Sequence, residues 1–402
     1  MYTFKRHKSG HHFGCLYQKP KDDRSQEARI ILQEKKLAEG ITMLCGLVGH
    51  GKSVAVMTLA NEYYNHGHNI VFVTCKENSE FDNCFTKFLP VHISHQIELK
   101  SLENPARTFP SYIYHPFTQD LPDKHQPAIT AFSYDVSKAL TARSLAVITG
   151  RDPDSDTVDL IVPIAQKLKP TENMFDLMYY LRMAVSQKDF KNIDKQTLAE
   201  ILELKERGNL NTIRAIATAF DTNKDKYYFL RERNHALRLD FVKQIMNRRG
   251  YHFYVDKYIT DEKIKYFANI MFIEQVIEAC SKSKYPTVII FEEIKHLMPK
   301  KSQLKYEETT TAEVIKNLNI ARSIGKGVRA IMTTQSLYEI PMGIRNTPTD
   351  IILMPQNMTD VSKLAHENSL NVDARANLLN LGIGEGYIFK EFVTDLSNRS
   401  RQ

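Results

Sequence analysis

The sequence predicts an α/β fold in which a mostly parallel sheet is flanked by helices and interrupted by a mainly helical insertion. Compact apolar runs at 41–46 and 69–75 enclose a helical pattern over 52–65, which is the strand–helix–strand order of a parallel sheet. The run TVIIF at 287–291 is the most apolar strand pattern in the chain. Between about 133 and 248, helical periods dominate and glycine and proline are sparse, which predicts the insertion.

Bulk properties place the chain among soluble, intracellular proteins. Its 402 residues suffice for one large domain with an insertion, or for two domains. No apolar run reaches the roughly 18 residues of a membrane span, and the basic N-terminus lacks the apolar stretch of a secretory signal. The five cysteines are scattered without a CxxC pair, which favours a reduced, cytoplasmic setting. A net charge of +7 is compatible with a polyanionic partner without identifying one.

The N-terminal third is predicted to contain an arm followed by the first part of the core. Residues 1–40 are expected to form a polar arm and, over 26–38, a short amphipathic helix. Residues 41–132 form the first core segment, and the run YIYHP at 112–116 adds a short strand.

The helical insertion at 133–248 precedes a second core segment at 249–402. Helices of the insertion are predicted at 134–147, 157–167, 174–187, 195–207, 209–220 and 233–247. In the second segment, strands are predicted at 251–255, 287–291, 328–333 and 350–354 and after the glycine turn at 384–386, with helices at 262–282 and 310–324.

A phosphate-binding loop is predicted at 46–53, where GLVGHGKS matches the pattern G-x-x-x-x-G-K-[ST]. Glycines let several backbone N–H groups point at one anion, and the following helix adds its positive N-terminal end. Lys52 would bind the β- and γ-phosphates of ATP, and the Ser53 hydroxyl would bind Mg²⁺. The alternative is a glycine turn that contains Lys-Ser by chance, but the strand before the loop and the helix after it favour nucleotide binding. The candidate nucleotide-binding residues are Gly46, Gly49, His50, Gly51, Lys52, Ser53 and Val54.

Two acidic residues follow the most apolar strand, as TVIIFEE at 287–293. In phosphate-loop enzymes the first acid orders the Mg²⁺ shell and the second polarises the attacking water. Glu292 would therefore order the Mg²⁺ shell, a position at which aspartate is more usual. Glu293 would polarise the attacking water. The alternative is a strand that simply ends in charged residues.

A third polar element follows the strand at 328–333, where the chain continues as TTQS. Gln335 would lie at the tip of a strand beside the acidic strand. There it could sense the γ-phosphate or orient the water, and the alternative is a glutamine that caps a loop.

The order GLVGHGKS, VIIFEEIKHLMP, ARSIGKGVRAIMTTQS, DIILM and LGIGEGYIF resembles the HerA/FtsK superfamily of DNA-pumping ATPases over roughly 41–80 and 250–390. The HerA-like branch is most similar, because its acidic strand is often followed by a short helix that carries a histidine, as in EEIKH at 292–296. Type IV secretion coupling proteins and viral genome-packaging ATPases share the outline.

The resemblance implies a RecA-like core that hydrolyses ATP with Mg²⁺ at the subunit interfaces of a hexameric ring and threads double-stranded DNA without sequence specificity. By position it also implies that phosphate and Mg²⁺ are bound by Gly46, Gly51, Lys52 and Ser53. Glu292 would then order the Mg²⁺ shell, Glu293 would polarise the attacking water, and Gln335 would be the sensor of the γ-phosphate. Arg322 occupies the place of an arginine finger, and Arg345 competes with it. The basic segment at 300–305 is the expected DNA loop.

The sequence departs from these relatives ahead of the phosphate loop. About 40 residues precede it, too few for the β-barrel of HerA proteins, and the N-terminal membrane helices of coupling proteins are not present in the sequence. A second hypothesis is therefore a nucleotide-gated adaptor that binds ATP, assembles, turns over slowly and recruits a nuclease or a secretion or packaging partner. A small-molecule kinase is a third hypothesis, which the TTQ strand after the acidic strand disfavours.

Overall fold

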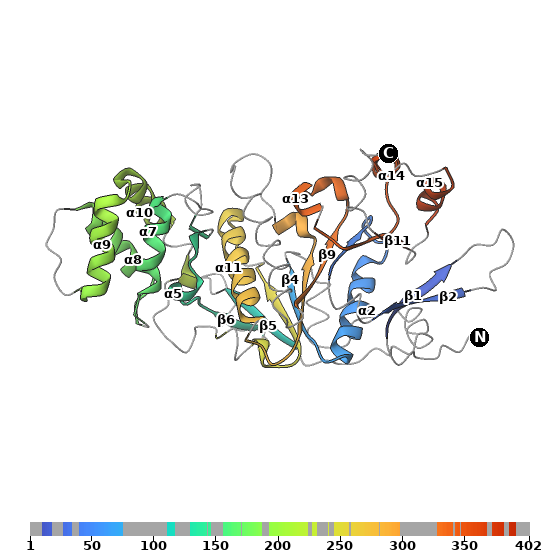
Figure 1. Cartoon of the computed structure of the whole chain (residues 1–402), viewed down its shortest axis with the longest axis horizontal. Coiled ribbons are helices and arrows are strands. Elements are labelled where there is room, and N and C mark those ends of the chain that lie inside the picture. Colours follow the sequence, from blue (N-terminus) through green and yellow to red (C-terminus); the bar gives the residue numbers. More distant parts are fainter. Residues whose placement is uncertain are drawn as a thin grey trace, which may run out of the picture.

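A sheet runs through the middle of the molecule, with helices on both of its faces (Figure 1). The computed structural model describes residues 10–17, 27–33, 40–74, 111–116, 129–142, 144–145, 156–169, 171–186, 193–223, 227–230, 240, 245–256, 259–280, 282–297, 328–340, 342–345, 347–367, 372–381 and 386–390. Within these residues the main sheet has nine strands, and β1 (Gly10–Tyr17) and β2 (Glu27–Gln33) form a separate antiparallel pair.

The main sheet is parallel apart from one edge strand. In spatial order its strands are β11 (Tyr387–Lys390), β10 (Asp350–Leu353), β3 (Ile41–Cys45), β9 (Val328–Thr334), β8 (Thr287–Glu292), β4 (Asn69–Thr74), β7 (Tyr251–Val255), β5 (Ser111–Pro116) and β6 (Ile129–Phe132). Only β11 runs antiparallel to its neighbour. This is the predicted fold class, and β9 lies beside the acidic strand β8 as predicted.

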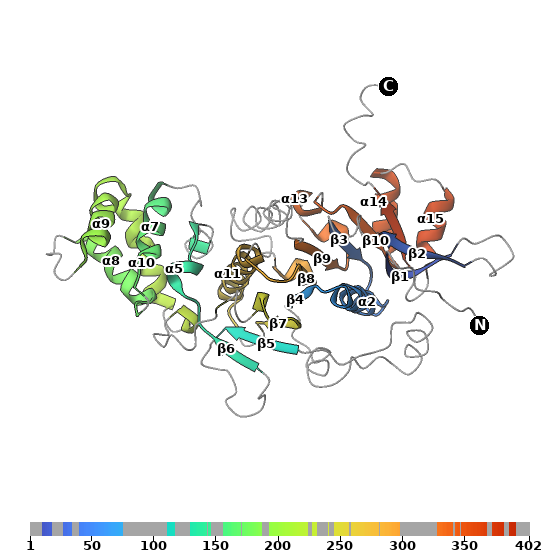
Figure 2. The same cartoon turned by 60° about the horizontal axis from the view of Figure 1, so that its bottom comes forward.

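Both faces of the sheet are buried, which explains why its strands are apolar at nearly every position. In β8, Val288 and Ile290 pack in a cluster with the helix α2 (Lys52–Asn65), whereas Ile289 and Phe291 pack in a second cluster with α11 (Glu262–Cys280). All four side chains are at most 1% exposed. Figure 2 shows α2 and α11 on opposite sides of the strands.

The chemically important residues lie where the strands of this sheet end, at their carboxyl-terminal ends. The strands β3, β9 and β8 are parallel neighbours, so their carboxyl-terminal ends lie together. The phosphate-loop motif follows β3, the TTQ segment ends β9, and the acidic pair ends β8. Ligands of open α/β sheets bind at this edge.

The predicted helical insertion is present. Its described helices are α5 (Val136–Ala139), α7 (Asp156–Gln166), α8 (Met174–Val185), α9 (Lys195–Arg207) and α10 (Leu210–Asn223), and α7 to α10 gather at one end of the molecule, beyond α11 (Figure 1). Asn173 and Asp176 form a capping box at the start of α8, and Asp194 caps α9, so local sequence sets where these helices begin. The buried side chains of the insertion belong to the same hydrophobic cluster as those of one face of the sheet. The domain boundaries at 133 and 248 therefore stay a prediction.

Four predicted helices differ from the structure or lie outside the described residues. The helix predicted at 26–38 is wrong: residues 27–33 form β2, because pairing with β1 satisfies their backbone and suits the β-branched Ile30 and Ile31. The helix predicted at 134–147 is interrupted after Ala139, where Leu140 is extended. The helix at 310–324 and most of the one at 233–247 lie outside the described residues.

Several elements were not predicted. These are β1, which forms where residues 1–25 were expected to be an arm, and β6, the 3-10 helices η1 (Tyr228–Leu230) and η5 (Leu337–Glu339), and the helices α13 (Met342–Arg345), α14 (Met358–Glu367) and α15 (Val372–Leu379). The short helix expected after the acidic pair is confirmed as the 3-10 helix η4 (Ile294–Leu297). Among the described helices, none is long and apolar enough to cross a membrane.

A buried histidine on β7 should make stability depend on pH. His252 is 0% exposed, its Nε2 lies 2.6 Å from the Arg248 carbonyl, and its ring stacks on Tyr112. Burial, and secondarily the charge of Arg248, lowers the pKa of His252 to about 4, whereas an unfolded histidine titrates near pH 6.5. The neutral ring therefore stabilises the fold fully above pH 6.5, and that contribution is lost as pH falls towards 4, by about 3 kcal/mol.

The measurement is urea unfolding of the wild type and of His252→Phe between pH 7 and pH 4. The variant keeps a flat buried ring but cannot titrate, so its free energy of unfolding should fall less steeply over this range. Equal slopes for the two proteins would contradict a buried, neutral His252.

Candidate nucleotide site

The phosphate loop curls because two of its glycines adopt a left-handed backbone. Gly49 has φ 78° and Gly51 has φ 92°, a region that side chains with a Cβ disfavour. Gly46 is needed for a different reason: a Cβ there would lie 2.7 Å from Cβ of Met354. The loop starts at the end of β3 and runs into α2, the order in which phosphate-binding loops aim backbone N–H groups and a helix N-terminus at one anion.

The start of the loop is held from both neighbouring strands. Gly46 N–H donates to the Thr334 carbonyl at 3.1 Å, and Leu47 N–H donates to the Pro355 carbonyl at 2.9 Å. Gln356 Nε2 donates to the Cys45 carbonyl at 2.8 Å, and its Oε1 accepts from the Cys45 thiol at 3.5 Å. Burial raises the pKa of Cys45 to about 12, so this thiol is a neutral structural donor.

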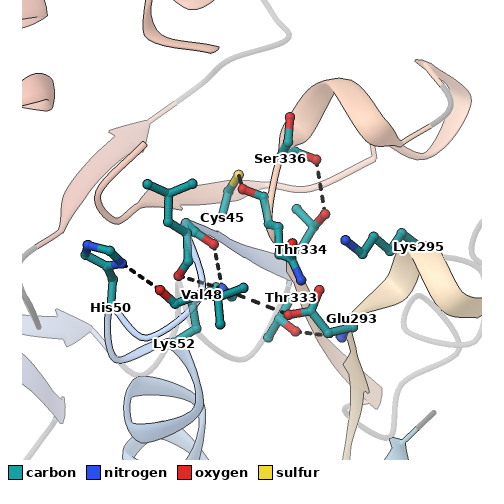
Figure 3. A network of polar contacts seen from close by, with 12 residues as sticks. Cys45, Val48, His50, Lys52, Glu293, Lys295, Thr333, Thr334 and Ser336 are labelled. Carbon is teal, nitrogen blue, oxygen red and sulfur yellow. Dashed lines mark hydrogen bonds and ion pairs between the residues drawn. The ribbon is translucent and has the colours of Figure 1, made fainter. Parts of the chain in front are cut away.

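Lys52 is buried and bound within the loop. Its Nζ donates to the Gly46 carbonyl and, at 3.0 Å, to the Leu47 carbonyl. The same atom lies 3.9 Å from Glu293 Oε1, at the outer limit of an ion pair. The residues from two different strand ends therefore converge, as the sequence predicts (Figure 3).

The two acids leave the strand in different ways. Glu292 is the last residue of β8 and is 3% exposed; because side chains alternate along a strand, it shares the α2 side with Val288 and Ile290. That side is where α2 begins and where half-buried Ser53 lies. Glu293 follows with φ 50°, the only positive φ of a non-glycine residue among those described. Its N–H donates to Thr333 Oγ1 at 2.8 Å.

One oxygen of the Glu293 carboxylate can accept a further hydrogen bond. Glu293 is 4% exposed, and its Oε2 has no hydrogen-bond partner among the described residues. A buried carboxylate oxygen needs such a partner. A water between the acid and the terminal phosphate of a nucleotide would supply it.

The donor types also suit a magnesium ion. No group of three or more His, Cys, Asp or Glu side chains lies together in the part of the chain that the structure describes. Mg²⁺ keeps several waters and takes few protein oxygens, so one hydroxyl and one carboxylate are a fitting pair. Ser53 and Glu292 supply those two oxygen types on the same side of the sheet.

The tip of β9 lies between the loop and the acids. Half-buried Gln335 follows Thr334, at the tip of β9 as predicted. Thr334 Oγ1 donates to the Ser336 carbonyl at 3.0 Å, and Ser336 caps η5 by accepting from Tyr338 N–H at 3.1 Å. These bonds stop the strand and fix the turn that carries Gln335.

The remaining predicted residues lie as follows. His50 Nδ1 lies 2.9 Å from the Val48 carbonyl at the exposed loop tip, and Val54 follows Ser53 in the first turn of α2. The guanidinium of Arg345 lies 5.0 Å from the centre of the Tyr338 ring. Arg322 and the basic segment at 300–305 lie outside the described residues.

Sequence reasoning missed two residues of this site. Thr333 was noted only as part of the TTQ segment, although it binds the backbone of Glu293. Gln356 holds the loop from the far side of β3. The available signal for Gln356 was its place just after the apolar strand β10, at the same sheet edge as the other polar residues.

A phosphate-loop motif, an acidic strand and a polar strand between them, all at the carboxyl ends of a parallel sheet, are typical of the RecA-like P-loop NTPase fold. Among the solved structures that match over most of the chain are VirB4 and the coupling protein TrwB. VirB4 of Thermoanaerobacter pseudethanolicus matches with 13% identity and a TM-score of 0.54, over 96% of this chain and 95% of that one. The plasmid coupling protein TrwB in complex with an ATP analogue matches with 12% identity and a TM-score of 0.55, over 91% and 85%.

These likenesses confirm the predicted fold, a RecA-like P-loop core with a mostly parallel sheet. They do not single out the HerA-like branch. TrwB has also been crystallised with ADP and Mg²⁺, again at 13% identity and a TM-score of 0.54. No protein-family model and no curated protein sequence matches the chain.

Proposed function

We propose that this chain is an ATPase that moves double-stranded DNA as a homo-oligomeric ring. The observation that carries the proposal is the convergence of Lys52 and Glu293, 3.9 Å apart, with Glu293 Oε2 left without a partner in the described part of the site. This pairing brings a phosphate-binding cation and a water-polarising acid to one buried point.

Each residue has a role that follows from its position. The phosphates of ATP would bind the N–H groups of the loop and the start of α2, and Lys52 would leave its loop carbonyls to bind them. Ser53 and Glu292 would hold Mg²⁺, which neutralises phosphate charge when bound. Glu293 would polarise the attacking water, and Gln335 would orient it or sense the γ-phosphate.

The DNA-moving part of the proposal has its own support. VirB4 and the conjugative coupling protein TrwB share this fold across most of the chain. The net charge of +7 suits sequence-independent contact with phosphates. We infer a hexameric ring in a cytoplasmic setting, an arginine finger at Arg322, and a nuclease or a secretion or packaging machine as partner.

A second candidate is the nucleotide-gated adaptor. It is favoured by the contacts of Lys52, which is tied to its own loop and to Glu293 and must be released before phosphates can bind. Glutamate rather than aspartate at position 292 also suits slow turnover. Such a protein would use ATP to assemble and would recruit a partner without moving DNA.

The test is steady-state ATP hydrolysis by the purified chain with linear double-stranded DNA, with heparin as a polyanion control, and without either. A translocase is stimulated by DNA and not by heparin, and the stimulation falls steeply with salt because phosphate contacts release counterions. Hydrolysis that is indifferent to DNA, together with ATP-dependent oligomerisation, would instead support the adaptor.

A further inference from the structure

The hydroxyl of Thr333 is bonded to the backbone of the proposed water-polarising acid. Glu293 N–H donates to Thr333 Oγ1 at 2.8 Å, between residues forty positions apart (Figure 3). Thr333 is 2% exposed, so this bond is made away from solvent. A buried N–H bonded in this way is costly to leave unsatisfied.

The bond lies where the sheet ends and the backbone turns. The pairing of β8 with β9 extends to Phe291 opposite Met332 and then stops. A side-chain hydroxyl on β9 therefore takes over from the backbone ladder, which lets the chain leave the sheet at Glu293. At φ 50° a residue with a Cβ is strained, and such a conformation persists only where neighbouring contacts hold it.

Little else among the described residues fixes the direction of the acid. Its Oε1 lies 3.9 Å from Lys52 Nζ, beyond hydrogen-bond distance, and its Oε2 has no partner there. The aim of the carboxylate therefore depends on the backbone that carries it. The same strand tip also holds the phosphate loop, through the bond from Gly46 N–H to the Thr334 carbonyl.

We propose that Thr333 is a positioning residue that holds Glu293 in its left-handed turn and so sets the distance between the acid and the phosphate loop. This inference rests on the proposed ATPase function. It assigns Thr333 to turnover of bound nucleotide and not to nucleotide binding, because the hydroxyl of Thr333 bonds to the backbone of Glu293, the acid proposed to act on water.

The experiment compares Thr333→Val with Thr333→Ser in the full chain. Valine keeps the shape but removes the hydroxyl, and serine keeps the hydroxyl. Thr287→Val is the matched control, since Thr287 is a buried threonine at the opposite end of β8. The measurements are kcat and KM for ATP, affinity for a fluorescent ATP analogue, and the thermal unfolding midpoint.

Thr333→Val should lower kcat roughly 10- to 100-fold, because misplacing a reacting group by about 1 Å has an effect of this size. Affinity for the analogue should stay unchanged, and Thr333→Ser should recover most of kcat. In a Glu293→Gln background, Thr333→Val should cause no further loss, because both changes remove one function. Thr287→Val should keep the wild-type kcat.

Two results would overturn the inference about Thr333 without affecting the proposed function. One is a Thr333→Val protein with wild-type kcat. The other is a double variant in which Thr333→Val lowers kcat, affinity and the unfolding midpoint further than Glu293→Gln does by itself. The second pattern is that of a general weakening of β9. A wild-type chain that turns over no ATP would instead overturn the proposed function, and the role of Thr333 in turnover with it.

Discussion

Glu293→Gln is expected to reduce ATP turnover by roughly 10²- to 10⁴-fold, the contribution of a positioned general base. Glutamine has nearly the same shape but cannot accept a proton from water. The variant should still bind ATP, because Lys52 and the loop glycines are unchanged. Turnover is measured as phosphate release at saturating ATP with DNA present, and binding is measured with a fluorescent ATP analogue.

Glu339→Gln provides a matched control for this change. Glu339 is an acid near the same sheet edge that pairs with Lys295 at 3.2 Å, and its side chain is 50% exposed. Exposed pairs of this kind contribute little, so the control should keep its turnover. If Glu293→Gln retains wild-type turnover while Glu292→Gln abolishes it, the roles that we assign to the two acids are reversed.

The sequence predicted the central strands well because each has a local signal that the fold does not override. In β8, TVIIFEE combines an apolar run with acids at its end, and the strand ends within one residue of the prediction. The helix α2 was predicted at its observed bounds, since it starts at the lysine of the loop motif. Parallel pairing of β3, β9 and β8 then had to bring their polar ends to one edge.

The failures depend on contacts between residues far apart in sequence. The run at 26–38 has an apolar spacing compatible with a helix, and only pairing with residues 10–17 makes part of it a strand. The bond from Gln356 to the Cys45 carbonyl joins residues 311 positions apart. The left-handed turn at Glu293 has no sequence signature, because glutamate gives no indication of a positive φ.

Lys52→Met is expected to weaken ATP binding roughly 10- to 100-fold, because it removes a charged hydrogen bond of about 1.5–3 kcal/mol to the phosphates. It should also destabilise the nucleotide-free protein. Lys52 and Glu293 have side chains only 8% and 5% exposed, so methionine leaves a buried carboxylate without its cation. Removing one partner of a buried pair costs about 3 kcal/mol.

The double variant Lys52→Met/Glu293→Gln separates these two effects. Its free energy of unfolding, measured in urea without nucleotide, should recover most of the loss, since the carboxylate that Lys52 faces is then neutral as well. Its ATP affinity should stay low, because the phosphate contact of Lys52 is still missing. If the single and double variants are equally unstable, the 3.9 Å approach contributes nothing to stability, and the loop carbonyls alone hold Lys52.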